Sequence, residues 1–246
     1  EQITEVPRAL TTSEQAVIAA SNVFGLDLRA RVAAADTRPN VVLSPLSASM
    51  ALGMTLNGAD GATFDAMRGA LGFGSLSQAE INASYRDLID LLTDLDTNVR
   101  FEIANAIWAN QGVPFHQAFF DVVAAAFDAN TESRDFANPA TLAAINAWVE
   151  DHTDGLIDTI LEQLDPMLVM LLVNAIYFDG AWTTQFDPQD TRTQPFTREN
   201  ASTVNVEMMS LTDVEISVGF GAAYAAGEHP DGGQAFPMVA VTPHTR

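Results

Sequence analysis

The chain has 246 residues, 48% of them hydrophobic, which is enough to bury the core of one large domain or two small ones. Its 32 acidic and 11 basic residues give a net charge of −21, so nucleic acid and anionic membrane surfaces would repel it. The absence of cysteine excludes disulfides, thiolate catalysis and cysteine-based zinc sites.

Helices are expected mainly in the first two thirds of the chain. Thr12 and Gln15 fit a capping box at the start of the first helix, and Ser44 fits the cap of a second helix whose first residue is Pro45. Apolar residues then recur every three or four positions in several further segments. The expected helices cover residues 12–34, 45–58, 63–71, 77–95, 116–127 and 139–155.

Strands are expected mainly in the second half. Residues 101–108 alternate with a period of two, and residues 169–178 form a nearly continuous apolar run, which is typical of a strand buried on both faces. This run is too short to cross a bilayer as a helix, so no membrane insertion is expected. Shorter strands are expected at 133–136, 203–209, 214–218 and 236–241. Helices that precede strands, without regular alternation, favour an α+β fold.

Catalytic motifs are absent from the sequence. There is no G-x-S-x-G elbow, Walker loop or H-E-x-x-H helix, and no dinucleotide-binding fingerprint. His116, His152, His229 and His244 lie far apart in the chain. Asp151 and His152 are neighbours, but consecutive helical residues point in different directions, which favours a solvated helix end. We therefore expect no catalytic site, metal site or cofactor.

Two triplets fit the acceptor sequence for N-linked glycans. They are Asn82-Ala83-Ser84, in an expected helix, and Asn200-Ala201-Ser202, just before an expected strand. Because such triplets arise often by chance, the sequence alone does not choose between them.

Several longer segments resemble the serpins, a family of protease inhibitors. Residues 40–59 (NVVLSPLSASMALGMTLNGA) and 61–73 resemble the strand and helices near the start of that fold. IANAIWAN at 103–110 and INAWVEDHTDGLI at 145–157 resemble a strand of its sheet A and the helix that crosses this sheet. NAIYFDGAWTTQF at 174–186 and the segment 203–209 complete a set that occurs in the family's order.

The resemblance implies a single serpin-like domain over residues 1–246. Its N-terminal helices would pack on a large mixed sheet A, with parts of sheets B and C. Ser44, Ser47 and Asn174 match the family's shutter, a polar cluster where sheet A opens, and Trp182 matches the breach, where insertion begins. The alternatives are that Ser44 is only a helix cap, that Asn174 is a buried hydrogen-bonded amide, and that Trp182 belongs to the core.

The mechanism that the resemblance implies needs no catalytic group. A serine or cysteine protease attacks an exposed reactive loop, and the cleaved loop inserts into sheet A as a new strand, which distorts the oxyanion hole of the acylated protease. Export from the cell is expected by resemblance. Since no basic and apolar leader follows Glu1, an export signal would have been removed or would be absent.

The match weakens in the last part of the chain. His229 and Asp231 stand where the family has apolar or aromatic residues, and Pro237 falls in an expected strand that needs a backbone donor. The family pattern would continue beyond Arg246 with a fifth strand of sheet A, the reactive loop and the last strands. Without them, residues 169–178 would form an open apolar edge that favours self-association.

Three functions remain open on this basis. The first is a serpin-type inhibitor of which this chain, lacking the reactive loop, would not be inhibitory by itself. The second is a serpin-like protein without inhibitory activity that binds a partner or associates with itself. The third is a hydrolase with an unrecognised site, although no residue cluster in the sequence supports one.

Overall fold

The structure is a computed structural model that describes residues 3, 5–38, 40–198, 200–212 and 214–243. The chain divides into two compact units. One comprises Pro7–Asp94 and Phe101–Phe178, and the other comprises Glu1–Val6, Leu95–Arg100 and Asp179–Arg246. We call them the helical unit and the strand unit, and we describe each by itself.

The helices of the helical unit lie where the sequence predicts them, with differences at their ends. They are α1 (Thr12–Ala35), α2 (Pro45–Leu56), α3 (Gly61–Ala70), α4 (Gln78–Thr93), α5 (Gln117–Phe127) and α6 (Pro139–Asp151). The sixth helix ends earlier than expected because Asp154 and Gly155 adopt positive φ angles of 51° and 77°. The chain therefore leaves the helical path before Gly155.

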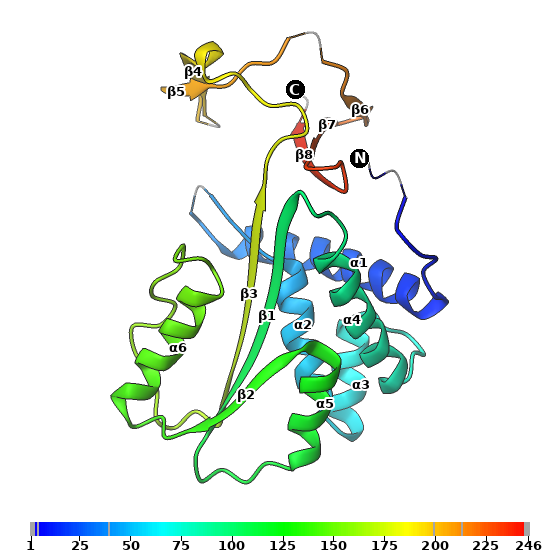
Figure 1. The fold of residues 1–246 in the computed structure, drawn as a ribbon, viewed down its shortest axis with the longest axis vertical. Coiled ribbons are helices and arrows are strands. Elements are labelled where there is room, and N and C mark those ends of the chain that lie inside the picture. Colours follow the sequence, from blue (N-terminus) through cyan, green and yellow to red (C-terminus); the bar gives the residue numbers. More distant parts are fainter. Residues whose placement is uncertain (1–2, 4, 39, 199, 213, 244–246) are drawn as a thin grey trace. The chain divides into compact units, whose positions relative to one another are not determined.

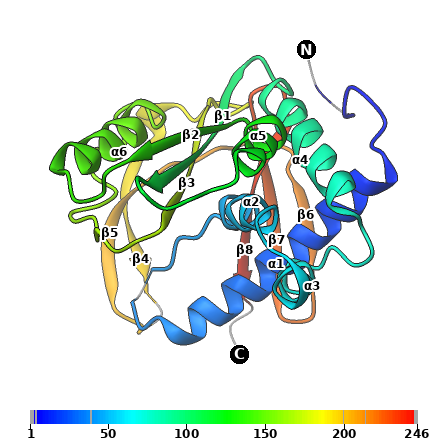
Figure 2. The ribbon, with the colours of Figure 1, turned by 90° about the horizontal axis from the view of Figure 1, so that it is seen from below.

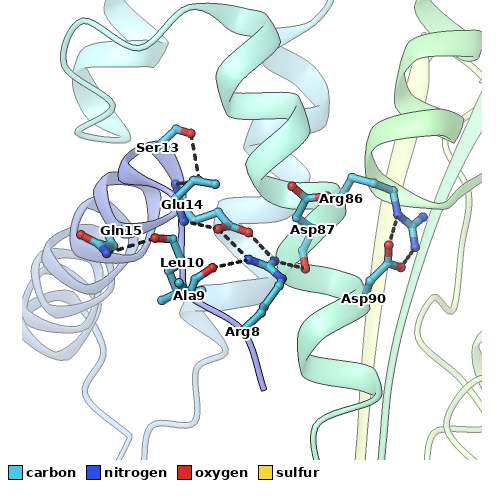
Figure 3. A network of polar contacts seen from close by, with 10 residues as sticks. Arg8, Ala9, Leu10, Ser13, Glu14, Gln15, Arg86, Asp87 and Asp90 are labelled. Atoms are coloured by element: carbon cyan, nitrogen blue, oxygen red, sulfur yellow. Dashed lines mark hydrogen bonds and ion pairs between the residues drawn. The ribbon is translucent and has the colours of Figure 1, made fainter. Parts of the chain in front are cut away.

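The cap of α1 corrects the sequence prediction by one residue. Thr11, not Thr12, is the N-cap, and its side chain accepts a hydrogen bond from the Glu14 backbone at 3.2 Å. The Glu14 carboxylate in turn accepts from the Thr11 backbone at 2.6 Å and from Arg8. A carboxylate that also pairs with an arginine makes a stronger box than the Gln15 amide would. Figure 3 shows this network at the start of α1.

The helical unit is built around a three-stranded sheet in the order β2-β1-β3, with β1 (Val99–Asn110) in the centre. Strand β2 (Ala129–Arg134) runs parallel to β1. It lies earlier than the expected 133–136, since its pairing with β1 ends at Arg134 and the chain then turns towards α6. Strand β3 is Met170–Gly180. The Asn110 backbone donates to the Val169 carbonyl at 3.0 Å, so the end of β1 lies beside the start of β3 and the two strands are antiparallel.

Helices cover both faces of this sheet (Figures 1 and 2). On one face, a large core joins residues of α1, α2, α4 and α5 to Ile107 of β1, and Leu172 of β3 packs against it. On the other face, Ile145 and Val149 of α6 pack with Trp108 and Val173. Neighbouring residues of β3 thus contact opposite cores. Only Val173, Ala175 and Tyr177 are buried, whereas Leu172, Asn174 and Ile176 on the other face are half-buried, so the prediction of a strand buried on both faces holds fully for one face only.

The strand unit consists of two small antiparallel sheets. One is a hairpin of β4 (Arg192–Thr197) and β5 (Thr203–Met208), preceded by a short 3-10 helix, η1 (Pro188–Asp190). The other has the order β6-β7-β8, with β6 (Ser217–Phe220), β7 (Tyr224–Asp231) and β8 (Phe236–Pro243). Strand β6 begins three residues later and ends two residues later than the expected strand at 214–218.

Strands β4 and β7 were not predicted, and Pro237 does not interrupt β8. Pro230 of β7 lies directly opposite Pro237 of β8 in the antiparallel pairing. The Pro230 carbonyl accepts from the Thr183 backbone at 3.0 Å, so the backbone groups of residue 230 point away from β8 and the two prolines form a pair without mutual hydrogen bonds. The missing N–H of Pro237 therefore falls on the outer side of the edge strand β8, where the ladder needs no donor. The expectation that Pro237 disfavours a strand is therefore wrong.

Candidate functional site

The candidate site is a pocket of about 390 Å³ in the helical unit, beside the edge of β3. Helix α2 contributes Ser47, Ala48 and Ala51, and β3 contributes residues 171–174. Ile160 and Leu161, from the segment after α6, complete the lining. Most of the surface is apolar, and the side chains of Ser47 and Asn174 supply its polar groups.

Asn174 and a buried partner on β1 connect the pocket to the core. The Asn174 amide donates to Oδ1 of Asn105 at 2.8 Å, and the Asn105 amide donates to the Phe127 carbonyl at the end of α5, also at 2.8 Å. Oδ1 of Asn174 is buried and accepts no hydrogen bond from the residues that the structure describes. An unmet acceptor of this kind favours binding of a donor at the pocket.

Asn105 was missed as a site residue. In the sequence it is one member of an alternating strand pattern, and it was not singled out from that pattern. The structure shows it to be 2% exposed, directly across from Asn174. The signal that could have found it is an asparagine on the apolar face of a strand, since a buried amide requires partners.

Ser44 and Ser47 lie at the start of α2. The Ser44 side chain caps the helix by accepting from the Ser47 backbone at 3.3 Å, and the two hydroxyls lie 2.7 Å apart. Ser44 is therefore a helix cap, as one of the two interpretations expects. Only Ser47 lines the pocket together with Asn174, and within the described residues neither serine is hydrogen-bonded to Asn174.

The wall of the pocket opposite α2 is fixed by Asn146 of α6. Its amide donates to the Leu161 carbonyl at 2.8 Å, and its Oδ1 accepts from the backbones of Ile160 and Leu161 at 3.1 and 3.0 Å. One side chain thus satisfies three backbone groups in a segment that has no regular structure. Asn146 holds this wall next to β3.

The pocket borders a free sheet edge. In the part of the chain that the structure describes, β3 pairs only with β1. Because Val169 accepts from Asn110, odd-numbered residues of β3 bond to β1, and the backbone groups of even-numbered residues point away from it. The N–H and C=O groups of Leu172, Asn174 and Ile176 therefore face the open side, where another strand could pair with them.

Trp182 lies in the strand unit in an aromatic cluster. Its ring contacts those of His229 and Phe186, with centroids 4.6 and 5.8 Å away. Residue Trp182 also forms an isolated bridge with Asp231, whose pKa is raised by burial, with His229 acting in the opposite direction. Both His229 and Asp231 therefore lie next to Trp182. These are the two residues that, in the sequence, depart from the expected pattern.

The described residues contain no cluster of three or more histidine, aspartate or glutamate side chains that could hold a metal ion. The ring of His152 stacks on Trp148 and bonds to its carbonyl, while His244 lies outside the described residues. No helix in the described part is long and apolar enough to cross a membrane.

Comparison with known proteins identifies the family. A family model described as "Serpin (serine protease inhibitor)" matches residues 19–223. The chain belongs to the serpin family. The α+β serpin fold is therefore confirmed, with β2, β1 and β3 in its mixed sheet A and the smaller sheets as parts of its sheets B and C.

Serpin relatives match most of this chain but only part of their own length. Neuroserpin from Gallus gallus is 36% identical over 179 residues, which are 72% of this chain and 44% of neuroserpin. Corticosteroid-binding globulin from Oryctolagus cuniculus is 30% identical over 203 residues, or 81% of this chain and 53% of that protein. The structure of cleaved Serpin 42Da matches with a TM-score of 0.84 and 28% identity, covering 95% of this chain and 62% of the other. This serpin chain thus spans about half the length of these curated relatives.

Proposed function

We propose that these residues form the sheet-bearing part of an inhibitor of serine or cysteine proteases that works by strand insertion. The observation that supports this most is the free edge of β3 beside the pocket. An inserted strand would pair with the backbone groups of Leu172, Asn174 and Ile176, and a donor on it could meet the unsatisfied Oδ1 of Asn174. Asn174, Ser47 and Ser44 would then act as the shutter, and Trp182 as the breach.

The proposal also covers whether this polypeptide alone is inhibitory and where the protein acts. Residues 1–246 by themselves are not inhibitory, because no segment of the sequence is identified as a reactive loop. The protein acts outside the cell, is not an enzyme and needs no cofactor. We also propose that both units belong to one serpin domain, since β1 and β3 each run from one unit into the other.

The direct test of inhibition is a covalent complex. A longer chain that carries the reactive loop should form a complex with its protease that survives SDS, whereas the 246-residue chain should form none with any protease in a serine and cysteine panel. A covalent complex with the 246-residue chain would contradict the proposal for this polypeptide. Cleavage of the longer chain by every protease without a complex would contradict the insertion mechanism.

The second candidate function is binding without inhibition, including self-association. Two observations favour it: a relative whose name states that it binds a corticosteroid, and the open edge of β3. Association through this edge should produce concentration-dependent oligomers in light scattering. Ile176→Pro removes an N–H from the open side and should reduce association, while Ile176→Ala loses side-chain packing but keeps that N–H. If both variants associate equally, the edge is not the interface.

A further inference from the structure

The hairpin of β4 and β5 ends in an exposed turn that contains one of the two glycan acceptor triplets. The last strand pair before the turn is Thr197 with Thr203, and Asn200, Ala201 and Ser202 are all exposed. The ends of the turn are held by hydrogen bonds from the Arg198 backbone to the Ser202 carbonyl, at 2.8 Å, and from the Ala201 backbone to the Arg198 carbonyl, at 2.9 Å. The triplet therefore lies in an exposed turn whose ends are hydrogen-bonded to each other.

The side chain of Asn200 is folded onto Ser202 in this turn. Its Oδ1 accepts hydrogen bonds from the Ser202 backbone at 3.0 Å and from the Ser202 hydroxyl at 2.6 Å. Ala201 makes this possible by adopting a positive φ of 62°. In the part of the chain that the structure describes, no group is hydrogen-bonded to Nδ2 of Asn200, so the amide nitrogen remains available to a reaction partner.

This arrangement suits transfer to the amide nitrogen. Hydrogen bonds that donate to Oδ1 pull electron density towards the oxygen and make the Nδ2 protons more acidic. The serine hydroxyl, which the acceptor triplet requires, supplies one of these bonds. The turn thus places the hydroxyl and the amide in mutual contact before any enzyme binds, which lowers the ordering cost of recognition.

The Asn82 triplet differs, because its asparagine side chain is hydrogen-bonded through both its nitrogen and its oxygen and its serine is buried. Asn82 lies within α4, where its Nδ2 donates to Oδ1 of Asn57 at 2.8 Å and its Oδ1 accepts from Asn57 and Gln78 at 3.1 and 2.9 Å. Ser84, which would supply the hydroxyl, is 2% exposed. A glycan on Asn82 would break the paired amides, and in the folded chain a transferase could not reach the buried hydroxyl of Ser84.

We propose that Asn200 is an acceptor for an N-linked glycan and that Asn82 is not. In the reaction, Nδ2 of Asn200 attacks C1 of the first sugar of a lipid-pyrophosphate-linked oligosaccharide. The N–C1 bond forms as the C1–O bond to the pyrophosphate breaks, the pyrophosphate leaves with the electron pair, and Nδ2 gives one proton to the transferase. This inference does not depend on the proposed inhibitory function, because it rests on the hairpin and on α4 alone.

The test compares the two triplets in the folded and the unfolded chain. The purified 246-residue chain is incubated with a single-subunit oligosaccharyltransferase and a lipid-pyrophosphate-linked oligosaccharide, and glycan occupancy is measured by peptide mass spectrometry. In the folded chain, Asn200 should be occupied at least about tenfold more than Asn82, because Asn82 becomes accessible only when α4 opens. In urea-unfolded, diluted chain the difference should largely disappear.

Variants separate the role of the turn from the sequence of the triplet. Asn200→Gln and Ser202→Ala should abolish modification of the hairpin, Ser202→Thr should retain it, and Asn82→Gln should leave the total occupancy of the folded chain unchanged. Should any variant fail to fold, the wild-type comparison of Asn200 with Asn82 still decides. An unmodified Asn200 in the folded wild-type chain, or equal occupancy of both asparagines there, would overturn the proposal.

Discussion

Glu14 shows how one fully buried carboxylate is kept charged. Hydrogen bonds from Arg8, and then from Thr11, outweigh the effect of burial and lower the pKa of Glu14 from 4.5 to about 2. Arg8 also donates to the Asp87 carbonyl of α4, so the same guanidinium ties the segment before α1 to another helix (Figure 3). Breaking such a pair leaves an uncompensated buried charge, which costs more than an exposed ion pair contributes.

The Glu14 pair should make stability depend on acid pH. Because the pKa of Glu14 is lowered in the folded state, its contribution is present above pH 4.5 and is lost as pH falls towards about 2. Arg8→Gln should therefore destabilise the chain clearly at pH 7 and much less at pH 2.5, as measured by urea unfolding. Arg31→Gln removes an exposed arginine paired with Asp27 and serves as the control, with little effect at either pH. An equal loss at both values would show that Arg8 acts by packing alone.

Asn105 should contribute to stability through the groups it satisfies. Asn105→Ala leaves the Phe127 carbonyl and the Asn174 amide without their partner in the core, and should lower the free energy of unfolding by about 1–3 kcal/mol. Asn130→Ala, an exposed asparagine on the neighbouring strand β2, is the matched control and should change it by less than about 0.5 kcal/mol. Urea unfolding, monitored by circular dichroism, measures the free energy of unfolding of both variants. Similar values for the two variants would refute the assigned role of Asn105.

Among the helices, α2 depends on close packing at Gly53. A Cβ there would lie 3.0 Å from the Tyr85 ring and 3.1 Å from the Phe127 ring, whereas a Cβ at Gly69 of α3 would meet no atom within 4 Å. Because both rings are fully buried in the core and have little room to move aside, Gly53→Ala should destabilise the chain by about 1–3 kcal/mol through overpacking. Gly69→Ala should stabilise it by about 1 kcal/mol through helix propensity. If thermal unfolding shows that both substitutions stabilise the chain or that both destabilise it, the contacts of Gly53 with the two rings do not determine the effect of adding a side chain there.

The elements that the sequence predicts well are those with local signals. Ser44 before Pro45 marks the start of α2, and the long apolar run marks β3. By contrast, β4 and β7 contain Pro195 and Pro230 and carry no alternation, so they become strands through their partners β5 and β8. Pairing between distant segments supplies hydrogen bonds that no local pattern reveals.

For the molecule as a whole, the sequence indicated the family and led to the proposal of Ser44, Ser47 and Asn174 as a shutter, but it did not reveal the contacts of these residues. The pairing of Asn174 with Asn105 depends on the register between β1 and β3, and the pocket depends on Asn146 holding the segment after α6. Both are relations between elements that are far apart in the chain. The sequence also could not distinguish the two glycan triplets, since the difference lies in burial and in the turn of the hairpin.

The central claim that we propose is that β3, among the residues that the structure describes, has an unpaired edge on which an inserted strand would pair. Amide hydrogen exchange, resolved by residue with NMR on monomeric chain, tests it most directly. Leu171, Val173 and Ala175 should be protected by β1, while Leu172, Asn174 and Ile176 should exchange at least about tenfold faster. Uniform protection along β3 in the monomer would contradict the account, because it would mean that both sides of the strand are already paired.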